Sequence, residues 1–151
     1  MLPSRYFIDL TQPEIAAQFK KNPLVILPAG SVEQHGPHLP TGTDIYASNV
    51  IGHAVAERMD GLVLPGGPLG VTPMHMPFEA TITLTPETYQ RVVVETGEST
   101  AKHGAKRLLI LNWHEGNIPS LAIASEKLHR DAGMSVIVVQ ACYVAAELYG
   151  N

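Results

Sequence analysis

Short apolar runs alternate with longer segments of helical character along this chain, and this alternation restricts the fold more than any other feature. Each run is only a few residues long, as expected of a strand that is buried on both faces. Strands separated by helices of this length form parallel βαβ units, because a parallel neighbour needs a crossover connection. The sequence therefore predicts an α/β fold with strands at residues 24–27, 62–64, 107–111 and 136–139.

Capping signals place helices between these strands. Thr11 and Glu14 form a capping-box pattern, and Thr85-Pro86-Glu87 combines an N-cap residue, a proline and an acid in a first turn. Gly61 and Gly104 stand where helix C-caps are expected. The predicted helices are one that follows Thr11 and those at residues 44–61, 85–103 and 118–131; residues 80–84 alternate Thr with apolar residues and are a candidate edge strand.

Composition predicts one soluble domain over residues 1–151. Ten Lys and Arg against 14 Asp and Glu give a net charge of −4, which argues against a basic surface for nucleic acid or an anionic membrane. The single cysteine, Cys142, excludes an intramolecular disulfide framework and fits a reducing compartment. No apolar run approaches the ~20 residues that span a bilayer, and the N-terminus does not have the pattern of a signal peptide. We therefore expect a cytoplasmic protein.

The loop after the first predicted strand carries unusual chemistry. Residues 30–44 read GSVEQHGPHLPTGTD. Glu33 and His35 are two apart, so in extended backbone they project to the same side, where they can bind one divalent ion or one ion each of a pair. Asp44 is a third potential ligand. The alternative is that Asp44 is only a helix N-cap and His38 only a surface residue.

The loop after the third predicted strand carries a second group of polar residues. Residues 112–117 read NWHEGN. His114 and Glu115 suit a metal ligand with an acid or base beside it, and the flanking Asn112 and Asn117 can brace the loop through hydrogen bonds. The alternative is a turn in which His114 and Glu115 are simply solvated. Both loops lie beyond the carboxyl ends of predicted parallel strands, where open α/β sheets bind ligands.

Together the two loops resemble the creatininase (creatinine amidohydrolase) family. Residues 30–44 look like its first signature, in which Gly-[Ser/Ala]-x-Glu-Gln-His-Gly-x-His precedes a metal-binding Asp. Residues 112–117 are similar to its second motif, Asn-Gly-His-x-[Gly/Glu]-Asn. The resemblance runs from about Leu24 onward and implies a three-layer α/β/α fold with a mostly parallel sheet.

The resemblance also implies a binuclear metal-dependent amidohydrolase. Glu33 and His114 would hold one ion, His35 would help to hold the other, and Asp44 would bridge both; the ions would be zinc and/or manganese. A metal-activated water would hydrolyse a C–N bond of a small amide or cyclic amide. Other members of the family remove formyl groups, cleave a peptide or hydrolyse a cyclic ketone, so these reactions stay open. The family also implies a homo-oligomer, commonly a hexamer.

Three departures from the family pattern shape the remaining expectations. Trp113 replaces the usual Gly of the second motif and is a candidate wall of the substrate pocket, the alternative being that it fills space under the loop. Gly116 stands where creatininase has a carboxylate ligand, two residues after His114. A later His-Ala-Gly-x-x-Glu-type motif, which supplies a general acid and a ligand in relatives, is absent from the 151 residues. We therefore expect a domain truncated relative to the family, and a non-catalytic or split subunit that binds metal and assembles with a partner chain is the alternative to an enzyme.

Four further residues complete the candidate site. Glu115 and His38 are the candidate catalytic residues, as an acid or base beside His114 and as a support for the metal site. His75 and Glu79, from a long loop that contains several apolar side chains, are candidates for substrate binding, the alternative being a structured loop that contacts a neighbouring subunit.

Overall fold

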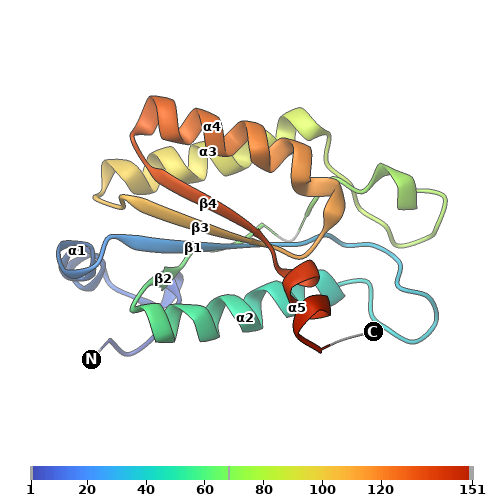
Figure 1. Ribbon diagram of the computed structural model, residues 1–151, viewed down its shortest axis with the longest axis horizontal. Coiled ribbons are helices and arrows are strands. Elements are labelled where there is room, and N and C mark those ends of the chain that lie inside the picture. Colours follow the sequence, from blue (N-terminus) through green and yellow to red (C-terminus); the bar gives the residue numbers. More distant parts are fainter. Residues whose placement is uncertain (1, 68, 150–151) are drawn as a thin grey trace.

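A four-stranded parallel sheet forms the middle layer of the protein (Figure 1). The computed structural model describes residues 2–67 and 69–149. The sheet has the order β2-β1-β3-β4, and β1 and β3 pair in register from Leu24↔Arg107 to Ala29↔Asn112. The strands are β1 (Leu24–Ala29), β2 (Leu62–Val63), β3 (Arg107–Asn112) and β4 (Ser135–Gln140).

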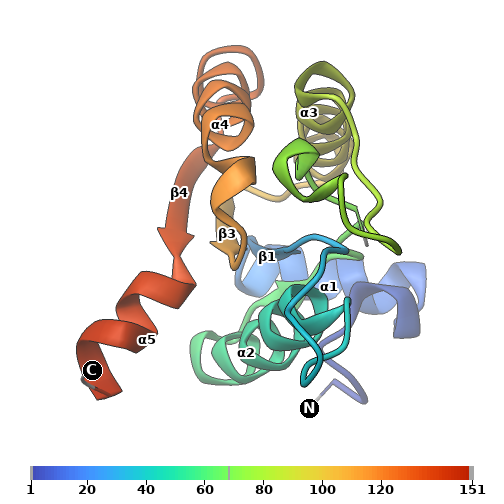
Figure 2. The ribbon, with the colours of Figure 1, turned by 90° about the vertical axis from the view of Figure 1, so that its right-hand side faces the viewer.

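Helices cover both faces of this sheet. Figure 2, which looks onto the carboxyl ends of the strands, shows α3 and α4 over one face and α2 over the other. The predicted α/β/α layering is therefore confirmed. The helices are α1 (Gln12–Lys21), α2 (Thr43–Met59), α3 (Pro86–Lys102), α4 (Ile118–Ala132) and α5 (Ala141–Tyr149), with short 3₁₀ turns at Phe7–Asp9, Pro73–His75 and Glu115–Asn117.

Two apolar clusters hold the layers together. The larger contains Val25, Ile110 and Leu128 and lies between the sheet and the α3–α4 layer, whereas the smaller joins Ile26 to Ala56 of α2. Each fully buried aliphatic side chain contributes about 1.5–3 kcal/mol relative to exposure. All six residues of β1 are buried because helices cover both of its faces, which explains why this strand reads as a continuous apolar run.

The predicted caps agree with the structure at two helices. The N–H of Thr11 donates to the Glu14 carboxylate at 2.8 Å, and Thr85 accepts from the N–H of Thr88 at 3.2 Å. The C-cap of α2 differs from the prediction, because Asp60, with φ 54°, takes the left-handed conformation expected of Gly61. Among the described helices, none combines the length and the apolar character needed to cross a bilayer.

Two other features differ from the sequence prediction. Residues 80–84 do not form an edge strand, because Ile82 bridges Val32 whereas Thr83 bridges Gly70, so no single partner strand runs alongside them. The helix α5 begins at Ala141 directly after β4 ends at Gln140, without an intervening loop or a cap signal that would predict it.

Candidate metal centre

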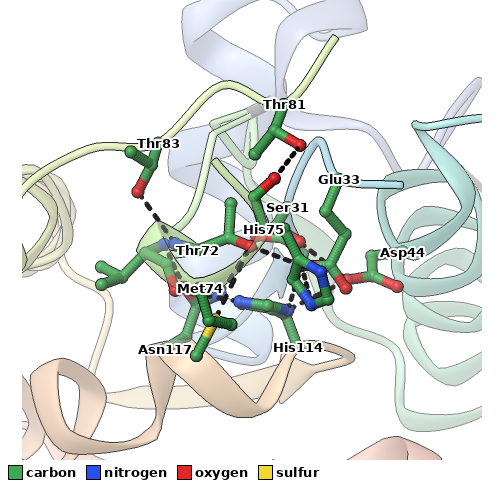
Figure 3. Close-up of polar contacts among 12 residues, drawn as sticks. Ser31, Glu33, Asp44, Thr72, Met74, His75, Thr81, Thr83, His114 and Asn117 are labelled. Carbon is green, nitrogen blue, oxygen red and sulfur yellow. Dashed lines mark hydrogen bonds and ion pairs between the residues drawn. The ribbon is translucent and has the colours of Figure 1, made fainter. Parts of the chain in front are cut away.

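Three buried side chains from distant parts of the chain meet at the carboxyl end of the sheet. Glu33 lies in the loop after β1, Asp44 in the first turn of α2, and His114 in the loop after β3. Each offers a ligand atom within 4.8 Å of the others (Figure 3). All three belong to the set predicted from sequence as metal ligands.

The ring of His114 has a defined orientation. Its Nε2 lies 2.9 Å from the carbonyl oxygen of Val71, so Nε2–H donates to that acceptor. Its Nδ1 then faces the carboxylates, 3.0 Å from Oε2 of Glu33 and 3.4 Å from Oδ2 of Asp44. Because Nε2 is engaged with a backbone carbonyl, Nδ1 is the ring nitrogen that is left to bind a metal ion, which it does in its unprotonated form, and a hydrogen bond of this kind at the other nitrogen is the usual way to orient a ligating histidine.

Two buried hydroxyl groups orient the carboxylates. Ser31 donates to Oδ2 of Asp44 at 2.9 Å, and Thr72 donates to Oε2 of Glu33 at 2.8 Å. Sequence patterns alone identify neither hydroxyl. Ser31 lies inside the first motif, but nothing in the pattern around Thr72 shows that the loop after β2 returns to Glu33.

The charges of the cluster favour a cation. Glu33 and Asp44 are both buried, and within the described part of the chain only histidines form ion pairs with them. Burial lowers the pKa of His114, but the contacts with Asp44 and the Val71 carbonyl and the charge of Glu33 outweigh it and raise the pKa overall. Two buried carboxylates and an imidazole nitrogen form an oxygen and nitrogen ligand set suited to a divalent ion, so the residues fit a metal.

His35 approaches the same cluster from its outer side. Its Nε2 lies 3.2 Å from Oδ1 of Asp44, and its Nδ1 lies 3.2 Å from the backbone oxygen of Glu33. One carboxylate oxygen of Asp44 thus faces His35, whereas the other faces His114. The helix cap that was the alternative role for Asp44 is wrong, because α2 begins at Thr43 with Gly42 in the N-cap position.

The loop after β2 brings a further histidine to the cluster. His75 Nε2 lies 3.9 Å from Oε2 of Glu33, and its Nδ1 lies 3.3 Å from the side-chain nitrogen of Gln34. The apolar side chains of Met74 and Phe78 on the same loop are 58% and 53% exposed. An apolar loop surface therefore lies next to His75 at the site, whereas Glu79 of the same loop is exposed and makes none of the hydrogen bonds of the cluster among the described residues.

The remaining candidates do not join the cluster. Glu115 is exposed and accepts a hydrogen bond from the hydroxyl of Tyr143 in α5. His38 is exposed as well, and within the described residues it takes no part in the hydrogen bonds that orient the ligands. Trp113 is half-buried, and its backbone N–H donates to the oxygen of Ala29 at 2.8 Å.

Gly116 is required by the packing around His114. A Cβ atom at this position would lie 2.0 Å from the Val71 oxygen and 2.5 Å from Nε2 of His114. No side chain fits there without separating the two groups. In this loop geometry, a carboxylate at position 116 is incompatible with the observed orientation of His114.

The fold and the cluster together define a class of protein. Members of this class have a three-layer α/β/α fold, with carboxylate and imidazole side chains that can bind metal at the carboxyl ends of a parallel sheet. Within that class, the chain belongs to the creatininase family, since the family's sequence model, described as creatinine amidohydrolase, matches residues 8–150. The resemblance of the two motifs to this family is confirmed.

The chain is similar to curated relatives with different named activities. It is 38% identical over 125 residues to the mycofactocin precursor peptide peptidase of Mycobacterium ulcerans (strain Agy99), covering 75% of this chain and 50% of that protein. It is 32% identical over 123 residues to the creatinine amidohydrolase of Pseudomonas putida, covering 78% of this chain and 47% of that protein. The chain thus spans about half the length of these relatives.

Solved creatininase structures share the fold. A mutant creatininase of the Zn-Zn type superposes with a TM-score of 0.82 at 28% identity, over 98% of this chain and 64% of that one. A manganese form, creatininase Mn, superposes with a TM-score of 0.79 at 28% identity, over 97% of this chain and 64% of that one. These similarities support a divalent metal at the cluster.

Proposed function

We propose that this chain carries the metal site of a creatininase-type hydrolase that cleaves a C–N bond of a small amide or cyclic amide. The observation that carries the proposal is the buried cluster of Glu33, Asp44 and His114, whose ligand atoms lie within 4.8 Å of one another and whose carboxylates pair only with histidines among the described residues. A cluster of this kind is costly to bury unless a cation binds it.

Each residue has a defined part in the proposal. Glu33 and His114 would hold one divalent ion, His35 would help to hold a second, and Asp44, which has one oxygen toward each histidine, would be shared by both. A divalent ion bound there would supply Lewis acidity to a substrate carbonyl and would lower the pKa of a water molecule. The hydroxyls of Ser31 and Thr72 hold the two carboxylates in their rotamers, so that the cluster needs little rearrangement when metal binds.

The amide class of substrate rests on what the relatives are named for. Creatinine amidohydrolase and the precursor peptide peptidase both act on C–N bonds, and both are more than 30% identical to this chain. The exposed Met74 and Phe78 beside His75 offer an apolar contact for a substrate held at the site, with His75 as a polar contact. The half-buried Trp113, next to His114 in the sequence, stays a candidate aromatic wall of the pocket.

Metal removal and reloading test the proposal. The purified chain is stripped with a chelator, reloaded with Zn²⁺ or Mn²⁺, and assayed against creatinine, formamides and short peptides, while mass spectrometry counts the bound metal. We expect hydrolysis that follows metal content and is lost in Asp44→Asn, which weakens the shared ligand. Hydrolysis that continues after complete metal removal would refute the proposal. Glu57→Gln, an exposed change on the same helix, is the matched control.

The same experiment separates the enzyme from the non-catalytic alternative. A chain that binds metal through Glu33, Asp44 and His114 yet hydrolyses none of the compounds, alone or mixed with a partner chain, is a metal-binding subunit. A chain that gains activity only on mixing is one part of a split enzyme. The 47–50% coverage of the curated relatives makes the mixing arm necessary.

A further inference from the structure

Two fully buried amide side chains, Asn112 and Asn117, connect the ends of three strands, since Asn112 at the end of β3 donates to Gln140 at the end of β4 and Asn117 donates to the oxygen of Gly30 after β1. The Nδ2 of Asn117 donates to the backbone oxygen of Gly30 at 3.0 Å and to Oδ1 of Asn112 at 3.1 Å. The Oδ1 of Asn117 accepts the N–H of Val71 at 2.9 Å. The carbonyl of Gly30 can only accept a hydrogen bond and the N–H of Val71 can only donate one. The side-chain amide of Asn117 therefore satisfies both partners only with Nδ2 toward Gly30 and Oδ1 toward Val71.

The backbone at Val71 and Thr72 in turn holds two of the candidate ligands. The oxygen of Val71 accepts from Nε2 of His114 at 2.9 Å, and the hydroxyl of Thr72 donates to Glu33 at 2.8 Å. The N–H of Thr72 donates to Oγ1 of Thr83 at 2.9 Å. The peptide group between Val71 and Thr72 is therefore held at its oxygen and at its N–H, while Asn117 holds the preceding N–H.

We propose that Asn117 is a positioning residue that fixes, through the backbone of Val71, which ring nitrogen of His114 faces the carboxylates. Without the hydrogen bond to Asn117, the Val71 oxygen is free to move away from Nε2. The imidazole then loses its anchor at Nε2, and Nδ1 is no longer held toward Glu33 and Asp44. The inference rests on the proposed metal site but does not require hydrolysis.

The variant Asn117→Ala tests this role on the full chain. Zinc binding to the metal-stripped protein is measured by calorimetry, and the tautomer of His114 in the zinc-loaded protein is read from the ¹⁵N shifts of its ring nitrogens. We expect zinc affinity to fall by roughly 10–100-fold, together with loss of the signal of the Nε2-protonated tautomer. The matched control is Asn49→Ala, whose amide donates to the Ile45 oxygen within its own helix and to no other acceptor among the described residues, and there both readouts stay unchanged.

A merely structural role makes a different prediction. If Asn117→Ala lowers the melting temperature but its folded fraction binds zinc as the parent does, with the same tautomer, the proposal is wrong. Should Asn117→Ala not fold, Thr83→Val decides, because it removes the acceptor of the Thr72 N–H with a side chain of similar shape. Zinc affinity lower than that of the parent is expected, and unchanged affinity and tautomer overturn the proposal. Zinc binding that depends on Asn117 in a chain without hydrolytic activity would contradict the proposed function alone.

Discussion

Gly116 is the residue whose identity the geometry of the site restricts most tightly. The change Gly116→Ala places a Cβ 2.0 Å from the Val71 oxygen, so the hydrogen bond between this oxygen and His114 must break. Loss of a buried partner costs about 1–3 kcal/mol in the free energy of unfolding. Zinc affinity falls roughly 10–100-fold, because the ring of His114 loses its anchor. Denaturant unfolding and zinc calorimetry measure the two effects.

A second glycine variant provides the comparison for this prediction. A Cβ atom at Gly67 would have no heavy atom of the described residues within 4 Å, apart from its own chain neighbours. Gly67→Ala therefore leaves zinc affinity unchanged and shifts stability by less than about 0.5 kcal/mol. If the alanine variants at positions 116 and 67 bound zinc equally well, the close packing of Gly116 against His114 would not matter for the site.

Single residues also mark the limit of prediction from sequence. The spacing of Glu33 and His35 indicates a shared side of one loop, and the position of His114 after a strand indicates the same edge of the sheet. Which hydroxyl meets which carboxylate depends on the path of the loop after β2. For this reason Thr72, which contacts Glu33 at 2.8 Å, is not predictable from its sequence neighbourhood.

At the scale of the elements, Asp60 joins the end of α2 to α1 and to the N-terminal segment. Its carboxylate contacts Lys21 and Arg5, both at 2.8 Å, and its backbone oxygen accepts from Gln18 and Asn22. The hydrogen bond from Lys21, followed by that from Arg5, lowers the pKa of Asp60 from 3.8 to about 2. A carboxylate with a depressed pKa in the folded state stabilises the protein above the unfolded pKa, and this stabilisation is lost as the pH falls through the folded pKa.

The variant Asp60→Asn tests this linkage. Asparagine tolerates the left-handed backbone at φ 54°, so the variant removes the charge without adding strain. We expect Asp60→Asn to be less stable than the parent near pH 6, and the difference to shrink as the pH falls from about 4 toward 2. Urea unfolding across this range measures it. A difference in unfolding free energy between parent and Asp60→Asn that stays constant down to pH 3 would contradict the assigned ion pairs. When both proteins also carry Lys21→Gln, most of this difference is expected to disappear.

The elements themselves are largely predictable, for physical reasons that differ between them. The strands β1 and β3 are covered on both faces and therefore read as apolar runs, whereas α1 and α3 are recognised from their caps. The helix α5 is not predicted from the sequence, because it begins directly after β4 without an intervening loop. Residues 80–84 alternate like a strand, yet their hydrogen bonds go to two different loop segments, at Val32 and at Gly70.

At the scale of the whole molecule, the two faces of the sheet are covered unequally. Val136 and Val138 of β4 pack against the larger apolar cluster, whereas Ile137 on the opposite face is 63% exposed. The strand β4 is also one of the two outer strands of the sheet in the described part of the chain. Exposed apolar side chains beside an open edge are typical of surfaces that contact other protein. The homo-oligomer expected from the sequence stays a prediction that these features favour.

Metal binding should stabilise the whole fold rather than one loop. The candidate ligands come from the loop after β1, the first turn of α2 and the loop after β3, and Thr72 from the loop after β2 contacts one of them. A cation held by all three ligands can bind only when these segments are in place. Zinc at about 100 times its dissociation constant should then add ~2.7 kcal/mol to the free energy of unfolding. In a domain of this size, that raises the melting temperature by roughly 5–10 °C.

The variant Asp44→Asn separates this effect from general stabilisation by salt or zinc. Without metal, we expect Asp44→Asn to melt at or above the temperature of the parent, because it removes one of two buried carboxylates that face each other across His114. With zinc, the melting temperature of the parent rises and that of Asp44→Asn stays where it is. Differential scanning calorimetry of both proteins, with and without zinc, measures the four values. An equal rise of the melting temperature in parent and variant would mean that zinc binds elsewhere. The cluster of Glu33, Asp44 and His114 would then not be the metal centre.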